Sequence, residues 1–193
     1  KTAMYVAGFD FRYYQKIHRD IILANRFAAG TSFGDQQLIY YLGATDNWIS
    51  FGTQNYFDTS TPVDNTRNFA YQALATNMRG FRQNVRNGNS FAVVNSEIRI
   101  PVFKYLIARP IKSDFIKNFQ AVGFADAGTA WNGTALFDST GQTTSHVIVK
   151  PPLTITLIEK NDPVVAGYGF GLRSRVMGYF VRTDWAWGYE NRK

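Results

Sequence analysis

The side chains that could do chemistry in this sequence are mainly arginines and carboxylates, and two pairs of them stand two residues apart. Glu97 precedes Arg99, and Arg182 precedes Asp184. Side chains at positions i and i+2 of a β-strand share one face, so each pair could meet there. A planar guanidinium can hold a carboxylate through two hydrogen bonds, which favours ion pairing over bond-making chemistry. Solvated charge on the strand face is the simpler interpretation, and the spacing alone favours it.

The groups needed for catalysis or metal binding do not come together in the sequence. Cysteine is absent, and the only two histidines, His18 and His146, lie far apart. There is no HExxH cluster and no G-x-S-x-G element. Alternate glycines from Gly167 to Gly171 could suggest a phosphate loop, but such a loop leads into a helix, and here a strand pattern continues to Arg173. We therefore expect no enzyme activity, no metal and no cofactor.

Composition narrows the class of protein. Of 193 residues, 18% are charged, below the roughly 25% usual for soluble domains. No run of about 18 apolar residues occurs, which excludes a transmembrane helix. The mean hydropathy of −0.23 still fits a membrane barrel, because its strands alternate lipid-facing apolar with lumen-facing polar residues. The net charge of +7 does not indicate nucleic-acid binding, since the arginines are scattered along alternating segments instead of gathered in a known motif.

Alternation with a period of two predicts six long strands. Residues 3–14 alternate aromatic with polar side chains over about a dozen positions. That length suits a tilted strand crossing a bilayer (about 9–11 residues) better than a sandwich strand (about 5–6). The other predicted strands cover residues 21–33, 90–105, 119–131, 164–176 and 179–187, and the last two form a hairpin. The pattern favours an all-β, antiparallel up-and-down transmembrane β-barrel, and leaves open a soluble barrel that holds a hydrophobic ligand.

The connections between these strands alternate between short and long. Residues 16–20 and 177–178 are predicted turns and residues 108–118 a polar connection, whereas residues 35–89 and 132–163 are long loops. Short turns at one rim and long loops at the other are typical of outer-membrane barrels. Trp and Tyr near strand ends suit an aromatic girdle at the membrane interface. We expect the first long loop to be irregular, with a helical turn or two at residues 69–75. In the second loop, residues 147–149 and 153–158 could form a hairpin.

Four motifs follow one another along the chain. Met78-Arg79-Gly80-Phe81 lies in the longest loop, and then come Phe124-Ala125-Asp126-Ala127-Gly128, Gly169-Phe-Gly-Leu-Arg173 and Arg182-Thr-Asp184. This series resembles the BamA/TamA-type superfamily, also called the bacterial surface antigen family. Its marks are an [aliphatic]-R-G-[F/Y] loop tip followed by F-x-D-x-G, G-x-G-x-R and R-x-D strands. The resemblance spans essentially the whole chain and is weakest at residues 3–14 and 132–163.

The resemblance implies that residues 1–193 are a partial, C-terminal β-barrel domain that begins near about the tenth of sixteen strands. By this resemblance the first nine strands, the final strand and any soluble module would lie elsewhere in the parent chain. The lack of a signal peptide also suggests a piece cut from a longer precursor. In such barrels the long loop, here residues 35–89, folds back into the lumen. An open sheet of six strands leaves two bare edges, so the isolated chain should aggregate or pair edge to edge.

The resemblance also implies roles for particular residues. Arg79 would pair with Asp126 on the lumen wall, with Glu97 as a further partner; Gly80 would let the backbone approach the wall, and Phe81 would anchor the tip. Removing one partner of such a confined ion pair can cost about 3–5 kcal/mol, so the pair would hold the loop in place. The remaining residues of the lumen wall would be Gly169, Gly171, Arg173, Arg182 and Asp184.

The implied function is insertion or assembly of outer-membrane proteins, or polypeptide translocation, at the bacterial outer membrane. The partners would be the lipid bilayer, the remaining barrel strands of the parent chain, client outer-membrane or secreted polypeptides and accessory lipoproteins, but no nucleic acid. Two alternatives stay open: a barrel that anchors a surface or periplasmic enzyme, and a small ligand-binding or porin-like barrel. A recognisable soluble domain upstream of Lys1 would decide among them.

Overall fold

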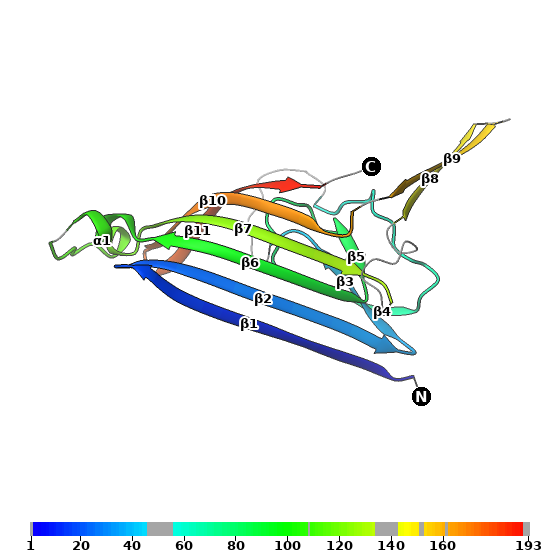
Figure 1. Ribbon diagram of the computed structural model, residues 1–193, viewed down its shortest axis with the longest axis horizontal. Helices are drawn as coiled ribbons and strands as arrows, with labels where there is room; N and C mark the ends of the chain where they lie inside the picture. The colour runs from blue at the N-terminus through cyan, green and yellow to red at the C-terminus, as the bar shows by residue number, and fades with distance from the viewer. Residues whose placement is uncertain are drawn as a thin grey trace.

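A six-stranded antiparallel sheet dominates the computed structural model, which describes residues 2–45, 56–107, 109–133, 143–150, 153–160 and 162–190 (Figure 1). The strands lie side by side in chain order: β1 (Met4–His18), β2 (Ile21–Gly34), β6 (Ser90–Ile100), β7 (Gln120–Trp131), β10 (Val165–Val176) and β11 (Tyr179–Tyr189). They run from 11 to 15 residues, about twice the length usual in globular proteins. The predicted all-β, antiparallel up-and-down arrangement is confirmed.

The two faces of this sheet differ because its strands alternate in sequence. On the face that we call the outer face, aromatic side chains meet across neighbouring strands: the ring centroids of Tyr5 and Phe33 are 5.5 Å apart, and those of Phe170 and Trp185 are 5.4 Å apart. Cross-strand aromatic pairs of this kind stabilise a sheet. The opposite, inner face carries the charged residues, among them Asp10, Arg26 and Asp126. The outer face is thus apolar and exposed.

Short connections gather at one end of the sheet. Arg19 and Asp20 link β1 to β2, which is shorter than the predicted turn at residues 16–20. Met177 and Gly178 link β10 to β11 with φ of +50° and +89°, as expected for a two-residue hairpin turn with both central residues left-handed.

The connection between β6 and β7 is the exception at this end, and two predictions about it are corrected. The strand predicted to run to residue 105 ends at Ile100, because Pro101 cannot donate to the ladder. The following residues form α1 (Val102–Leu106) and α2 (Asp114–Lys117) instead of an irregular polar connection. Figure 1 shows α1 at the end of the sheet opposite the hairpin of β8 (Thr143–Lys150) and β9 (Leu153–Lys160).

Both long loops contain strands of their own. β3 (Gln37–Leu42) pairs in parallel with β4 (Phe69–Leu74) and antiparallel with β5 (Arg86–Gly88). The helical turn predicted at residues 69–75 is therefore wrong, because that segment extends along the apolar strand β3. The hairpin predicted in the second loop is confirmed as β8 (Thr143–Lys150) paired with β9 (Leu153–Lys160).

The core lies between the small β4–β3–β5 sheet and the inner face of the large sheet. It joins loop residues to strand residues, namely Ala28, Tyr40, Leu42, Met78, Val85, Phe91, Val93, Ala130 and Val165. Tyr40 and Phe91 make a direct ring contact, with centroids 4.8 Å apart. The long loop is therefore packed against the inner face. Within the described ranges, no helix is both long enough and apolar enough to cross a membrane.

Candidate functional site

The tip of the long loop, residues 78–81, is held by a short antiparallel bridge to the segment that follows β3. The backbone N–H of Met78 donates to Ala44 O at 2.9 Å, and the N–H of Ala44 donates to Phe81 O at 3.1 Å. Met78 is fully buried. This bridge fixes the backbone of the tip, so the side chain of Arg79 points in a defined direction.

Arg79 reaches Asp126 on β7 and holds it through three hydrogen bonds. Its Nε and Nη2 donate to the two carboxylate oxygens at 2.7 Å each, and its backbone N–H donates to Oδ2 at 3.2 Å. Asp126 is only 2% exposed. Such a two-pronged, charge-assisted pair is among the strongest polar contacts in proteins. Burial by itself lowers the pKa of Arg79, but the hydrogen bond and charge of Asp126 raise the pKa above its ordinary value, so the guanidinium stays charged.

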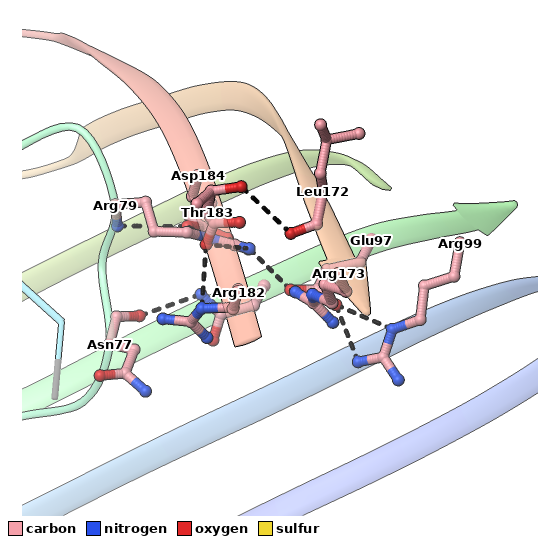
Figure 2. Close-up of polar contacts among 11 residues, drawn as sticks. Asn77, Arg79, Glu97, Arg99, Leu172, Arg173, Arg182, Thr183 and Asp184 are labelled. Atoms are coloured by element: carbon pink, nitrogen blue, oxygen red, sulfur yellow. Dashed lines mark hydrogen bonds and ion pairs between the residues drawn. The ribbon is translucent and has the colours of Figure 1, made fainter. Parts of the chain in front are cut away.

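Glu97 on β6 is the second carboxylate of the site and binds three guanidinium groups. Its Oε1 accepts from Arg79 Nη1 at 2.6 Å and from Arg173 Nη2 at 2.8 Å. Its Oε2 accepts from both Nε and Nη2 of Arg99, at 3.0 and 2.8 Å. Figure 2 shows Arg79 approaching from the loop while Glu97 and Arg173 project from neighbouring parts of the sheet wall. Glu97 therefore couples the loop tip to β6 and β10.

The register of the sheet explains why these residues meet. Asn95, Asp126, Gly167 and Gly188 stand opposite one another across β6, β7, β10 and β11. The row beside it carries Glu97, Phe124 and Gly169. Side chains two residues apart on a strand share a face, so both rows line the inner face.

Two glycines make room for the tip. A Cβ at Gly167 would stand 2.1 Å from Arg79 O, and one at Gly188 would stand 2.6 Å from Gly80 O. Gly80 itself has φ of +90°, a left-handed conformation that glycine adopts without strain. The loop backbone thus packs directly on the backbone of β10 and β11.

The glycines expected to line the lumen have different neighbours. A Cβ at Gly169 would meet Trp185 O and the Phe124 ring, and one at Gly171 would meet the Asp184 carboxylate. Of these glycines, only Gly167 and Gly188 therefore lie directly against the backbone of the loop tip. Phe81 lies beside both of them, since a Cβ at Gly188 would also be 2.6 Å from its ring.

Arg182 and Asp184 on β11 lie at the edge of the cluster. Arg182 Nε is 3.2 Å from Asp184 Oδ2, and Arg79 Nη1 is 4.0 Å from the same oxygen. The structure therefore brings together Arg79, Asp126, Glu97 and Arg173, with the Arg182–Asp184 pair touching this group only at the limit of an ion pair.

Besides Gly188, sequence reasoning missed three further contributors to the site. Phe124 lies under Arg79, with its ring centroid 3.6 Å from the guanidinium carbon, a cation–π contact. Asn95 Nδ2 donates to Asn77 O at 3.1 Å and so holds the residue before the tip. Arg86 binds Asp162 O through two nitrogens, at 3.0 and 2.6 Å, and Glu190 at 2.5 Å. Phe124 could have been found from its spacing of two from Asp126, whereas no local signal marks Arg86.

A polar cavity of about 240 Å³ adjoins the ion pairs on the inner face. Arginines from both lateral edges of the sheet line this cavity: Arg12 and Arg26 come from β1 and β2, and Arg182 comes from β11. Asp10 binds Arg12 and Arg26 at 3.0 and 2.6 Å.

In the part of the chain that the structure describes, no group of three His, Asp or Glu could hold a metal ion. The charged groups of this site can position and bind other groups through ion pairs and hydrogen bonds.

Comparison with known proteins gives a family. Neither the curated proteins nor the solved structures contain a match. A family model, described as the Omp85 superfamily domain, matches residues 1–192. Members of this superfamily act in outer-membrane protein assembly and translocation without catalysing a reaction. The match agrees with the BamA/TamA-type resemblance and with an all-β, up-and-down sheet that forms part of a barrel. The chain belongs to the Omp85 superfamily.

Proposed function

We propose that this chain forms the C-terminal wall of an outer-membrane barrel that inserts or translocates polypeptides, and that Arg79 locks its long loop inside the lumen. The observation that supports the lock is the buried contact of Arg79 with Asp126 and Glu97, which joins one loop residue to two strands. In this proposal residues 35–89 are the inward-folded loop of a partial barrel domain.

The lock acts through position and charge. Arg79, Arg99 and Arg173 share the carboxylates of Asp126 and Glu97, so each carboxylate is neutralised and each guanidinium is held. Losing one partner would leave a charge unpaired in a confined site, at a cost of about 3–5 kcal/mol. The loop would then detach from β7 and lose its defined place on the inner face, and the barrel would lose the arrangement on which the proposed activity depends.

Replacement of Arg79 by alanine in the full-length protein tests the proposal. The readout is the rate at which vesicles that contain the protein fold an unfolded outer-membrane client into the bilayer, or transport a secreted polypeptide. Arg79→Ala should lower that rate severalfold. Arg82→Ala is the matched control, because Arg82 is exposed and only three residues away.

The outcomes separate the proposal from the other barrel functions. If the Arg79→Ala protein reaches the vesicle membrane normally and handles its client at the parent rate, the contact of Arg79 with Asp126 and Glu97 is not needed for the proposed function. A full-length protein that moves no client at all, but lets small solutes cross the vesicle membrane, would favour a porin-like barrel instead.

A further inference from the structure

The connection between β6 and β7 differs from the other two connections at the same end of the sheet. Those are two-residue turns, whereas this connection forms α1 and α2. It is tied to its neighbours: Ser174 Oγ of β10 donates to Phe115 O at 2.7 Å, and Lys104 Nζ is 3.1 Å from Asp20 in the β1–β2 turn. The helices therefore have a defined place at this rim.

These helices expose apolar side chains that no core covers. Neither helix contains a buried residue, although the Phe119 ring makes tilted contacts with the rings of Phe103 and Phe115, with centroid separations of 5.3 and 5.9 Å. Leu106 is 72% exposed, and Ile107 and Phe115 are also exposed. These ring contacts hold the two helices together and leave the side chains of Leu106, Ile107 and Phe115 at the surface.

Basic residues surround the exposed apolar side chains. Residues 16–20, 101–119 and 175–178 together hold seven Lys or Arg and two Asp, a net charge of +5 out of +7 for the chain. The long loops at the opposite rim carry no such excess: residues 35–89 have four basic and four acidic residues, and residues 132–164 have two and three. Arg109, Lys112 and Lys117 are exposed.

The same rim continues into the apolar outer face of the sheet. Tyr179 begins β11 beside the turn residue Met177, and both side chains are highly exposed. In outer-membrane barrels the short-turn rim faces the periplasm. The helices α1 and α2 would therefore lie level with the headgroups of the periplasmic leaflet.

We propose that α1 and α2 form an interfacial anchor that binds anionic phospholipid. In this arrangement Leu106, Ile107 and Phe115 insert among the acyl chains, and Arg109, Lys112 and Lys117 bind headgroup phosphates. Exposed apolar groups flanked by Lys and Arg are what such interfacial segments need. Continuity with the lipid-facing outer face favours a membrane over an acidic protein as the partner. The inference rests on the proposed membrane barrel.

A single spin label tests the anchor, because the chain has no cysteine of its own. Leu106→Cys in the full-length protein, with any other cysteine replaced by serine, is labelled with a nitroxide and reconstituted into vesicles. The measurement compares collision of the label with oxygen, which concentrates in lipid, and with a water-soluble nickel complex. Labels at Tyr168→Cys on the outer face and Asn65→Cys in the long loop report lipid and water.

In vesicles that contain phosphatidylglycerol, the Leu106 label should resemble the Tyr168 label, with a severalfold excess of oxygen over nickel collisions. That excess should fall in phosphatidylcholine vesicles and with the double variant Lys112→Glu/Lys117→Glu, but not with Arg82→Glu. Frequent collisions of the Leu106 label with the nickel complex would overturn the anchor. So would an excess of oxygen collisions that changes neither in phosphatidylcholine vesicles nor with the double variant. A label shielded from both reagents overturns it in favour of a protein partner. A Tyr168 label that reports water would instead overturn the membrane barrel itself.

Discussion

Gly167 lies directly beneath the carbonyl oxygen of Arg79: a Cβ added at this glycine would stand 2.1 Å from that oxygen. Gly167 is also the cross-strand neighbour of Asp126. One small area of the inner face therefore receives both the backbone and the side chain of Arg79. The contact therefore depends on the absence of a side chain at Gly167 in β10 as much as on the carboxylate of Asp126 in β7.

Gly167→Ala should push the loop tip away from the sheet and lengthen the contact of Arg79 with Asp126. The obstacle is backbone, which cannot rotate aside, so we expect a loss of about 1–3 kcal/mol. Thermal unfolding of the protein in detergent would measure this. Gly123→Ala is the control, because its Cβ would meet only the end of the Ile98 side chain, at 3.3 Å. Equal losses in the two variants would contradict the close packing of the tip.

Arg79→Met and Asp126→Ala should each destabilise the loop, by up to about 3–5 kcal/mol, because the first leaves the buried Asp126 without its partner and the second leaves Arg79 with Glu97 alone. The double variant should lose much less than the sum, since neither charge then remains. Protease cleavage within residues 56–78 of the folded protein would report loop release, with unfolding by urea as the second measurement. Additive effects of the two substitutions would show that the residues do not act as a pair.

The strands were predictable from the sequence because their alternation is long and regular. Residues 21–33 and 119–131 fall almost on β2 and β7, and the resemblance supplied the family. The long loop was harder: β4 looks weakly helical in isolation, and only its parallel pairing with β3 makes it a strand. Pairing between distant segments of this kind leaves no local pattern.

The same distinction applies to the site. Arg79, Asp126 and Glu97 could be nominated because the resemblance to the BamA/TamA-type superfamily implied that they pair. The contribution of Gly188 and Arg86 could not, because each depends on segments far apart in the chain that only the register brings together. Likewise the predicted strand ran past Pro101 to residue 105, so neither the end of β6 at Ile100 nor the helices that follow it were predicted.

Phe124→Leu should weaken the hold on Arg79 while leaving both carboxylates in place. The variant keeps an apolar side chain but removes the ring face that lies 3.6 Å from the guanidinium carbon. A desolvated cation–π contact contributes about 2 kcal/mol, so thermal unfolding should show a loss of that order. Phe124→Tyr keeps the ring and should behave almost like the parent protein. A Tyr variant as unstable as the Leu variant would point to packing and not to the cation–π contact.

Arg86→Lys should loosen the base of the long loop. Arg86 donates to Asp162 O and Glu190 at the same time, and so joins the loop to the segment before β10 and the end of β11. A lysine cannot reproduce the planar fork, and each lost charged hydrogen bond costs about 1.5–3 kcal/mol. Arg67→Lys is the control: its ion pair with Asp64 is partly exposed, and such pairs contribute about 0–1 kcal/mol. Hydrogen exchange of the β5 amides should rise only in the Arg86 variant.

Met177→Asn should stabilise the β10–β11 hairpin. Met177 has φ of +50° and is 93% exposed, so its side chain contributes little packing in a conformation that disfavours it. Asn followed by Gly178 is the preferred pair for a turn with both central residues left-handed, and the expected gain is about 0.5–1 kcal/mol. Met177→Val is the opposite control, because a β-branched residue tolerates positive φ poorly. A higher unfolding temperature for Asn than for Met, and a lower one for Val, would show that the backbone conformation of this turn limits stability. A parent protein more stable than both variants would mean that contact of Met177 with lipid, and not the backbone of the turn, decides stability here.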